Sequence, residues 1–155
     1  MMKKALITIV LVFILGLSSF AQEAKVAFGY GAEMNMNAEY GVGGGALLNF
    51  DVNLLSRYAI GASITMSGDN SYNGILETAV MVRRYFLSLH EGFFVGVDAG
   101  FSIFTLRDEK TVYMFLAGVR GGYRLPFGEF LYVEPYIRAG YPFFVGVGVV
   151  AGYRR

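Results

Sequence analysis

Residues 143–153 alternate strictly between two kinds of side chain. One set is an apolar ribbon: Phe143, Val145, Val147, Val149, Ala151 and Tyr153. The other set is mostly glycine: Phe144, Gly146, Gly148, Val150 and Gly152. Because successive side chains of a β-strand point to opposite faces of a sheet, this stretch predicts a strand. It has the length of a tilted membrane strand, roughly 9–11 residues, and is too short for a membrane helix, which needs about 20.

The same alternation recurs along the chain and predicts eight strands, at about 25–34, 41–54, 57–67, 75–86, 92–104, 111–125, 130–140 and 143–153. Turn-forming residues separate them, as at 67–71, 107–110 and 126–128. An even number of antiparallel strands with short connections can close on itself and leave no sheet edge. We therefore predict an all-β, closed, eight-stranded, antiparallel up-and-down transmembrane barrel. Pro135 within the seventh strand would remove a ladder hydrogen bond, which predicts a bulge there.

Alternation alone does not say which face is inside, since a soluble lipocalin-like barrel has an apolar interior. Glycine decides the question. Glycine weakens a strand on a solvated outer face, but the narrow interior of an eight-stranded barrel needs small residues beside large ones. The glycines gather on the polar face, which we therefore place inside: Gly29, Gly31, Gly41, Gly43, Gly45, Gly61, Gly96, Gly100, Gly118, Gly122, Gly140, Gly146, Gly148 and Gly152.

The charged residues of the strands gather on the same polar face. They predict a structural charge network in the lumen, made of Glu33, Asp51, Glu77, Arg83, Asp98, Arg120, Arg124, Glu134 and Arg138. Buried charges must be paired. If the hairpin at 126–128 is centred on Phe127, Arg120 faces Glu134 across the sixth and seventh strands. Similar hairpin registers bring Arg83 near Asp98 and Asp98 near Arg120, a ladder across four neighbouring strands.

The apolar face carries one charged residue, Arg84, near a strand end where its head can reach the membrane interface. Aromatic residues also collect near the strand ends of this face. They predict two interfacial girdles, formed by Tyr58, Phe86, Phe93, Tyr113, Tyr123, Tyr141, Phe143 and Tyr153.

The first 21 residues predict a cleavable secretory signal peptide. Lys3 and Lys4 precede an apolar run at 5–17, and Ser19-Phe20-Ala21 is a small-x-small cleavage site, so residues 22–155 form the mature barrel domain. The chain has no cysteine, which excludes disulfides, thiolate metal sites and a lipoprotein anchor. A net charge of +1 argues against nucleic-acid binding.

The sequence holds few candidates for chemistry. His90, the only histidine, lies in a short turn with Ser88 and Glu91, but three such residues in one turn imply no catalytic relay. Asp69 with Asn70, and Asp108 with Glu109, are interpreted as solvated turns rather than cation sites, and the glycines at 41–45 lack the lysine of a phosphate loop. We expect no enzymatic activity, no cofactor and no metal.

A signal peptide, eight alternating strands, a glycine-rich inner face and aromatic strand ends resemble the small outer-membrane β-barrel proteins, such as the membrane domain of OmpA and the OmpX group. The resemblance is architectural and covers residues 22–155. It implies a bacterial outer-membrane location, contact with outer-membrane lipid and assembly by the barrel-assembly machinery. Two features depart from the family: the chain ends in Tyr153-Arg154-Arg155 rather than in an aromatic residue, and it carries no OmpA-type peptidoglycan-binding domain.

We therefore expect a non-enzymatic, monomeric barrel with a packed polar lumen and a role in envelope structure or surface interaction. The predicted external loops, at about 35–40, 68–74, 105–110 and 140–142, are too short for a ligand-binding domain. Two alternatives stay open: a narrow, porin-like pore for ions or small solutes, and a soluble lipocalin-like barrel that binds an apolar ligand.

Overall fold

The computed structural model describes residues 25–37, 41–68, 72–88, 90–106 and 110–155. The predicted signal peptide lies outside these ranges, as do the turn residues at 69–70 and 108–109. Eight strands follow one another: β1 (Val26–Asn37), β2 (Gly41–Leu55), β3 (Tyr58–Gly68), β4 (Tyr72–Tyr85), β5 (Gly92–Leu106), β6 (Thr111–Phe127), β7 (Leu131–Tyr141) and β8 (Val145–Arg154).

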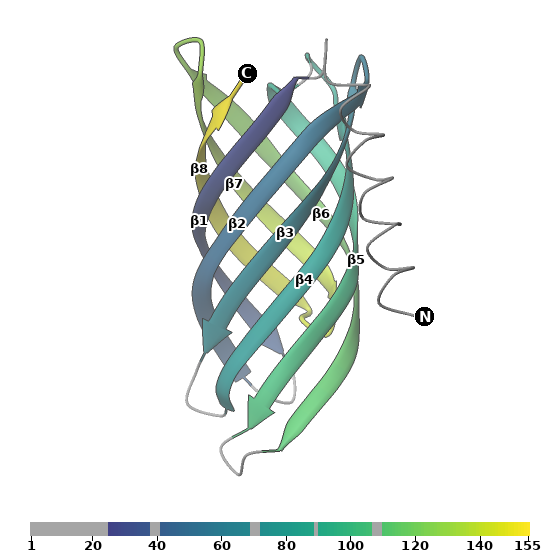
Figure 1. Ribbon diagram of the computed structural model, residues 1–155, viewed down its shortest axis with the longest axis vertical. Coiled ribbons are helices and arrows are strands. Elements are labelled where there is room, and N and C mark those ends of the chain that lie inside the picture. Colours follow the sequence, from purple (N-terminus) through teal and green to yellow (C-terminus); the bar gives the residue numbers. More distant parts are fainter. Residues whose placement is uncertain (1–24, 38–40, 69–71, 89, 107–109) are drawn as a thin grey trace, which may run out of the picture.

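The strands form one closed antiparallel barrel in the order β1 to β8, which confirms the predicted eight-stranded architecture (Figure 1). Closure is made by β1, which pairs with β2 on one side and with β8 on the other, where Ala27 lies opposite Arg154 and Met36 opposite Val145. Every strand therefore has two neighbours, and the sheet has no free edge. Within the described ranges, no helix is long and apolar enough to cross a membrane.

Different strand connections lie at the two ends of the barrel. The start of β1 and the end of β8 lie together at one end, uppermost in Figure 1, with the turns β2–β3, β4–β5 and β6–β7. We call this the terminal end. The connections β1–β2, β3–β4, β5–β6 and β7–β8 lie at the opposite, distal end.

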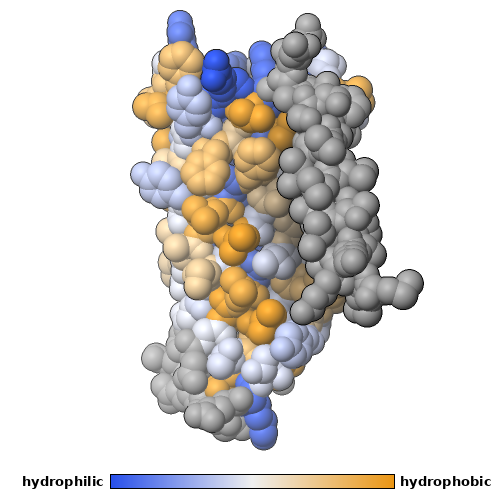
Figure 2. Space-filling model, viewed as in Figure 1, coloured by the Kyte–Doolittle hydropathy of each residue, from blue (hydrophilic) through white to orange (hydrophobic). Residues whose placement is uncertain are grey.

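Side chains alternate between a buried inner face and an exposed outer face, as a pleated strand requires. On the inner face, Met81 and Phe94 are fully buried, whereas Phe101 and Tyr113 on the outer face are 64% and 73% exposed. Apolar side chains dominate the visible outer surface between more polar ends (Figure 2). The large hydrophobic residues of this chain thus lie mainly on the outside of the barrel.

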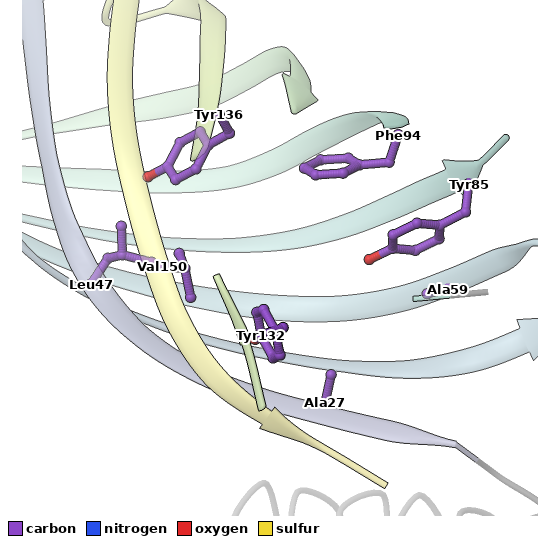
Figure 3. Packing of buried hydrophobic residues seen from close by; sticks show 8 residues of the cluster. All are labelled: Ala27, Leu47, Ala59, Tyr85, Phe94, Tyr132, Tyr136 and Val150. Carbon is purple, nitrogen blue, oxygen red and sulfur yellow. The ribbon is translucent and has the colours of Figure 1, made fainter. Parts of the chain in front are cut away.

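Tyrosine rings from β7 lie in the barrel interior and pack against glycines of β8. A Cβ atom at Gly148 would lie 2.5 Å from the Tyr136 ring, and one at Gly152 would lie 2.5 Å from the Tyr132 ring. Both tyrosines belong to the buried cluster of Figure 3, which also contains Tyr85 and Phe94. Glycine on the inner face of β8 therefore makes room for the rings on the neighbouring strand.

The strand boundaries differ from the predicted ones mainly at the distal end, where β1 reaches Asn37 and β4 begins at Tyr72. The predicted bulge at Pro135 is wrong. Pairing between β6 and β7 lapses beside Pro135, but the register is the same before and after it. The register shifts instead between Asn53 and Leu55 on β2, and between Tyr72 and Gly74 on β4.

Candidate functional site: the buried polar lumen

The nine charged residues of the predicted network all lie on the inner face and are at most 9% exposed: Glu33, Asp51, Glu77, Arg83, Asp98, Arg120, Arg124, Glu134 and Arg138. They project from six strands; the inner residues of β3 and β8 are small or apolar, apart from Arg154 at the end of β8. Five are acidic and four are arginine. The structure divides them into three groups.

The first group, which we call the balanced cluster, contains Asp51, Arg83, Arg124 and Glu134. Arg83 Nη1 lies 2.9 Å from Glu134 Oε1 and 3.3 Å from Asp51 Oδ2. Arg124 donates from Nε to Glu134 Oε2 at 2.5 Å and from Nη2 to Asp51 Oδ2 at 2.9 Å. Each arginine thus bridges both carboxylates, and the formal charges cancel.

The balanced cluster spans the lumen from wall to wall. Asp51 is on β2 and Arg124 on β6, which are four strands apart in a closed barrel of eight and therefore face each other. Aromatic rings enclose the guanidinium groups: Arg124 lies 4.1 Å from the Tyr132 ring centroid, and Arg83 lies 5.0 Å from that of Phe94. Desolvated cation–π contacts of this kind add to the ion pairs. The cluster fills the cross-section of the barrel at its level.

The second group, the acidic cluster, contains Glu33, Glu77 and Arg138 from β1, β4 and β7. Arg138 Nη2 lies 2.6 Å from Glu33 Oε1 and 2.7 Å from Glu77 Oε2. Two neutral groups supplement this single cation: the Tyr136 hydroxyl donates to Glu33, and Ser102 Oγ donates to Glu77 Oε1 at 3.2 Å. The acidic cluster therefore holds one formal negative charge that no arginine in it neutralises.

The third group is a local pair between neighbouring strands. Arg120 on β6 donates from Nε to Asp98 Oδ2 on β5 at 3.1 Å, and its guanidinium lies 4.5 Å from the Tyr136 ring centroid. A small pocket beside this pair is lined by Asp98, Gly118, Arg138, Gly140 and Phe143, among others, and has room for about one water molecule.

Of the three ion pairs that the hairpin registers predicted, one is present and two are not. The Asp98–Arg120 contact is present. The predicted Arg120–Glu134 pairing is wrong, because Arg120 lies opposite Arg138 in the β6–β7 ladder. The hairpin is centred on residue 129 rather than 127, which places Arg124 against Glu134 instead. Arg83 binds Asp51 and Glu134 rather than Asp98. Pairing across the lumen thus joins pairs between neighbouring strands, and the predicted four-residue ladder does not form.

The terminal mouth of the lumen is closed by the β4–β5 turn, a role that the sequence did not reveal. His90 has a positive φ of 60° and is only 2% exposed, with its ring edge-on to Tyr85 and its Nε2 3.8 Å from Asp51 Oδ1. Burial lowers the pKa of His90 to about 4, and the nearby Asp51 carboxylate opposes this only in part. At neutral pH the ring is therefore uncharged, and its contact with Asp51 is not an ion pair.

The same turn is fastened to the end of the chain. Arg154 on β8 binds the Glu91 carboxylate, which also accepts a hydrogen bond from Ser88 Oγ at 2.9 Å. These two hydrogen bonds lower the pKa of Glu91. Because two strands lie between β5 and β8 and three lie between β4 and β8, this contact crosses the terminal mouth. The turn that the sequence offered as a poor catalytic candidate is thus part of the contacts across the terminal mouth.

Seven of the eight predicted interfacial aromatic residues are exposed on the outer face: Tyr58, Phe86, Phe93, Tyr113, Tyr123, Tyr141 and Tyr153. The prediction for Phe143 is wrong. Its side chain is 3% exposed and packs inside the barrel against Ile75 and Phe104. β8 begins only at Val145, so the strand alternation does not extend to this residue, and Phe144 is the one that faces outward.

Two further sets of residues bear on the site: the predicted glycine-rich segment and two buried asparagines. The glycine-rich segment at 41–45 is part of strand β2, not a loop before a helix. Asn35 and Asn49, which the charge pattern did not single out, are at most 2% exposed, and their side-chain amides make no hydrogen bond to any described residue. Among the described residues, no group of three or more histidine and acidic side chains is placed to hold a metal ion.

Comparison with known proteins finds likeness at the level of the fold. No protein-family model matches the chain. No curated protein matches its sequence. Among solved structures, it is similar to the N-terminal β-barrel domain of Pseudomonas aeruginosa OprF, with a TM-score of 0.63 and 13% identity over 86% of this chain and 98% of that one. It is also similar to Ail, the attachment invasion locus protein of Yersinia pestis, with a TM-score of 0.53 and 14% identity over 85% of this chain and 97% of that one. The chain therefore shares the architecture of small eight-stranded barrels of this kind.

Proposed function

We propose that the chain is a monomeric, non-enzymatic β-barrel of the bacterial outer membrane whose packed polar lumen serves as its structural core. One observation carries this proposal: the apolar side chains face outward and the charged ones inward. A soluble barrel requires the reverse, because its outer face meets water and its inner face forms an apolar core. An apolar outer face of this kind is compatible with the hydrocarbon of a lipid bilayer.

The role that follows is in envelope structure or surface interaction. Within the described residues, the lumen is crossed by two charge clusters and its terminal mouth is closed by the β4–β5 turn, an arrangement that suits a stable core better than a wide channel. The likeness to the OprF barrel domain and to Ail supports the proposed outer-membrane location. Export by the signal peptide and assembly by the barrel-assembly machinery belong to the same proposal.

Fractionation and gel mobility test this proposal together. We expect the protein in the outer-membrane fraction, and we expect it to migrate differently before and after boiling in detergent, because a closed hydrogen-bonded barrel resists unheated detergent. A protein that is soluble without detergent and shows no heat shift would contradict the membrane location. It would turn the search to a lipocalin-like barrel with an apolar ligand.

A narrow pore is the second candidate, favoured by the surplus carboxylate of the acidic cluster and by the Asn35 amide two positions along β1 from Glu33, which has no hydrogen-bond partner among the described residues. Buried polar groups without protein partners usually bind water, and a hydrated acidic lumen favours cations. Conductance in planar bilayers separates the two candidates. Discrete steps that Glu77→Gln alters would support a pore, whereas a silent barrel would support the packed core.

A further inference from the structure

Arg84 is the exception on the outer face of the barrel. It lies on β4 opposite Tyr58 of β3 and Val95 of β5, next to the end of the strand at Tyr85. Among the outward-facing positions of the described strand residues, it is the one charged side chain. The inward-facing arginines Arg83, Arg120, Arg124 and Arg138 all have carboxylate partners. Arg84 has none among the described residues.

Two aromatic rings hold the Arg84 side chain in place. Its guanidinium carbon lies 5.8 Å from the ring centroid of Tyr58 and 5.2 Å from that of Phe86, and Phe86 in turn packs against Phe93 at 5.3 Å. Cation–π contacts use none of the guanidinium N–H groups in a hydrogen bond, so the donors of Arg84, which has no carboxylate partner among the described residues, can bind an anion. The site is thus a planar, positioned donor group on an otherwise apolar surface.

The surrounding charge favours an anion at this level of the barrel. Among the described residues, Lys25, Arg57, Arg154 and Arg155 lie at the terminal end with Arg84, against two acidic residues outside the lumen, Glu91 and Glu129. Arg154 is occupied by Glu91. Lys25, Arg57 and Arg155 are exposed. A fixed guanidinium at the border between an apolar wall and a cationic rim is complementary to one chemical group of a membrane, the lipid phosphate.

We propose that Arg84, positioned by Tyr58 and Phe86, binds the phosphate group of a glycerophospholipid in the leaflet at the terminal end, and so sets the depth of the barrel in the membrane. The lipid tails lie along the apolar outer face of β3 to β5, and the guanidinium donates hydrogen bonds to the phosphate oxygens. This inference rests on the proposed membrane location. In the orientation expected for this barrel, the leaflet concerned is the periplasmic one.

Native mass spectrometry of the protein purified from membranes tests the site with phosphatidylglycerol as the probe. We expect the wild type to retain one phosphatidylglycerol preferentially, and Arg84→Met to weaken that binding about tenfold, as the loss of a charge-assisted hydrogen bond predicts. Arg57→Met is the matched control. It removes the same charge at the same end but leaves the Arg84 site intact, so its effect stays below about twofold.

Several outcomes would overturn the proposal. These are undiminished binding by Arg84→Met, equal losses in Arg84→Met and Arg57→Met, equal binding of diacylglycerol, which lacks the phosphate, and displacement of the lipid by inorganic phosphate at the same concentration. Heat-modified gel mobility of every variant checks separately that a closed membrane barrel is present. A wild type that is soluble and shows no heat shift would instead contradict the proposed function.

Urea unfolding in lipid vesicles is an independent test, because the two possible roles of Arg84 predict opposite changes in the unfolding midpoint. If Arg84 only faced hydrocarbon, Arg84→Met would raise the urea midpoint, because methionine is the better residue in lipid. If Arg84 binds phosphate, the same substitution lowers the midpoint in phosphatidylglycerol vesicles, and Arg84→Lys recovers only part of the loss because lysine lacks the planar fork. A raised midpoint for Arg84→Met would contradict the proposal.

Discussion

The balanced cluster and the acidic cluster satisfy buried charge in different ways. In the balanced cluster, two arginines each bridge Asp51 and Glu134, so each charge is neutralised by two opposite ones. In the acidic cluster, Arg138 alone serves Glu33 and Glu77, and neutral hydroxyl donors supply the rest. The formal charges of the first cluster cancel, whereas the second has one carboxylate more than it has arginines. The comparison teaches that one lumen can contain both a charge-neutral cluster and a cluster with a surplus charge, for which we expect different responses to loss of a carboxylate.

Breaking the balanced cluster should have the largest effect. Glu134→Gln leaves Arg83 and Arg124 to share Asp51, and an uncompensated buried charge typically costs about 3–5 kcal/mol of unfolding free energy. Urea unfolding in lipid vesicles, followed by circular dichroism because the chain has no tryptophan, measures the loss. Glu129→Gln, in the exposed β6–β7 turn, is the control and should stay within about 0.5 kcal/mol. A Glu134→Gln barrel as stable as the wild type would show that the cluster contributes no net stability.

Acidic pH should destabilise the folded barrel through His90, which lies beside the balanced cluster. The pKa of His90 falls from 6.5 to about 4 on burial. Between these values the unfolded state binds a proton that the folded state does not, so stability is complete above about pH 6.5 and decreases as the pH falls toward 4. The loss reaches about 3 kcal/mol. The charged and titratable groups around the ring are Asp51, Tyr85, Arg83, Arg124 and Glu134.

Comparison of the wild type with His90→Asn isolates this effect from the titration of the carboxylates. Asparagine tolerates the left-handed backbone at this position but has no titrating ring. The unfolding free energies of the two proteins should therefore converge as the pH falls from 7.5 to 4. Parallel pH profiles would show that His90 stays accessible to protons in the folded barrel.

Removing the surplus charge from the acidic cluster should leave the free energy of unfolding nearly unchanged or raise it slightly. Glu77→Gln leaves Arg138 paired with Glu33; the new amide oxygen can take the place of Oε2 and accept from Arg138, while the amide NH2 takes the place of Oε1 and donates to Ser102 Oγ. We expect the free energy of unfolding to change by no more than about 1 kcal/mol, because relief of carboxylate repulsion offsets the weakened ion pair. A loss as large as that of Glu134→Gln would remove the distinction between the clusters.

An effect of similarly small size concerns the hydroxyl that supplements Arg138. Ser102→Ala removes one buried hydrogen bond to Glu77 and should cost about 1 kcal/mol. A double-mutant cycle with Glu77→Gln sharpens the comparison: the Ser102 contribution should shrink when its acceptor is no longer charged. Additive effects of the two substitutions would show that Ser102 does not serve to stabilise the surplus carboxylate.

The sequence predicted the strand number, the closed barrel and the inward position of the charges because all three follow from a period of two along each strand. The residues at 143–144 show the limit of that argument. There β8 has not yet begun, and the pattern placed Phe143 on the wrong face. His90 shows a second limit, since a turn residue has no period and its insertion into the lumen depends on the packing around Asp51 and Tyr85.

By itself, then, the sequence determined which charged strand residues face the lumen, and only the tertiary structure decided which of them meet. A hairpin slipped by an even number of residues leaves every side chain on the same face, so the hydrophobic pattern cannot distinguish Arg120 from Arg124 as the partner of Glu134. Contacts such as Arg124–Asp51 join strands on opposite walls. These contacts exist only because closure of the barrel folds the sheet back on itself and brings residues 73 positions apart within hydrogen-bonding distance.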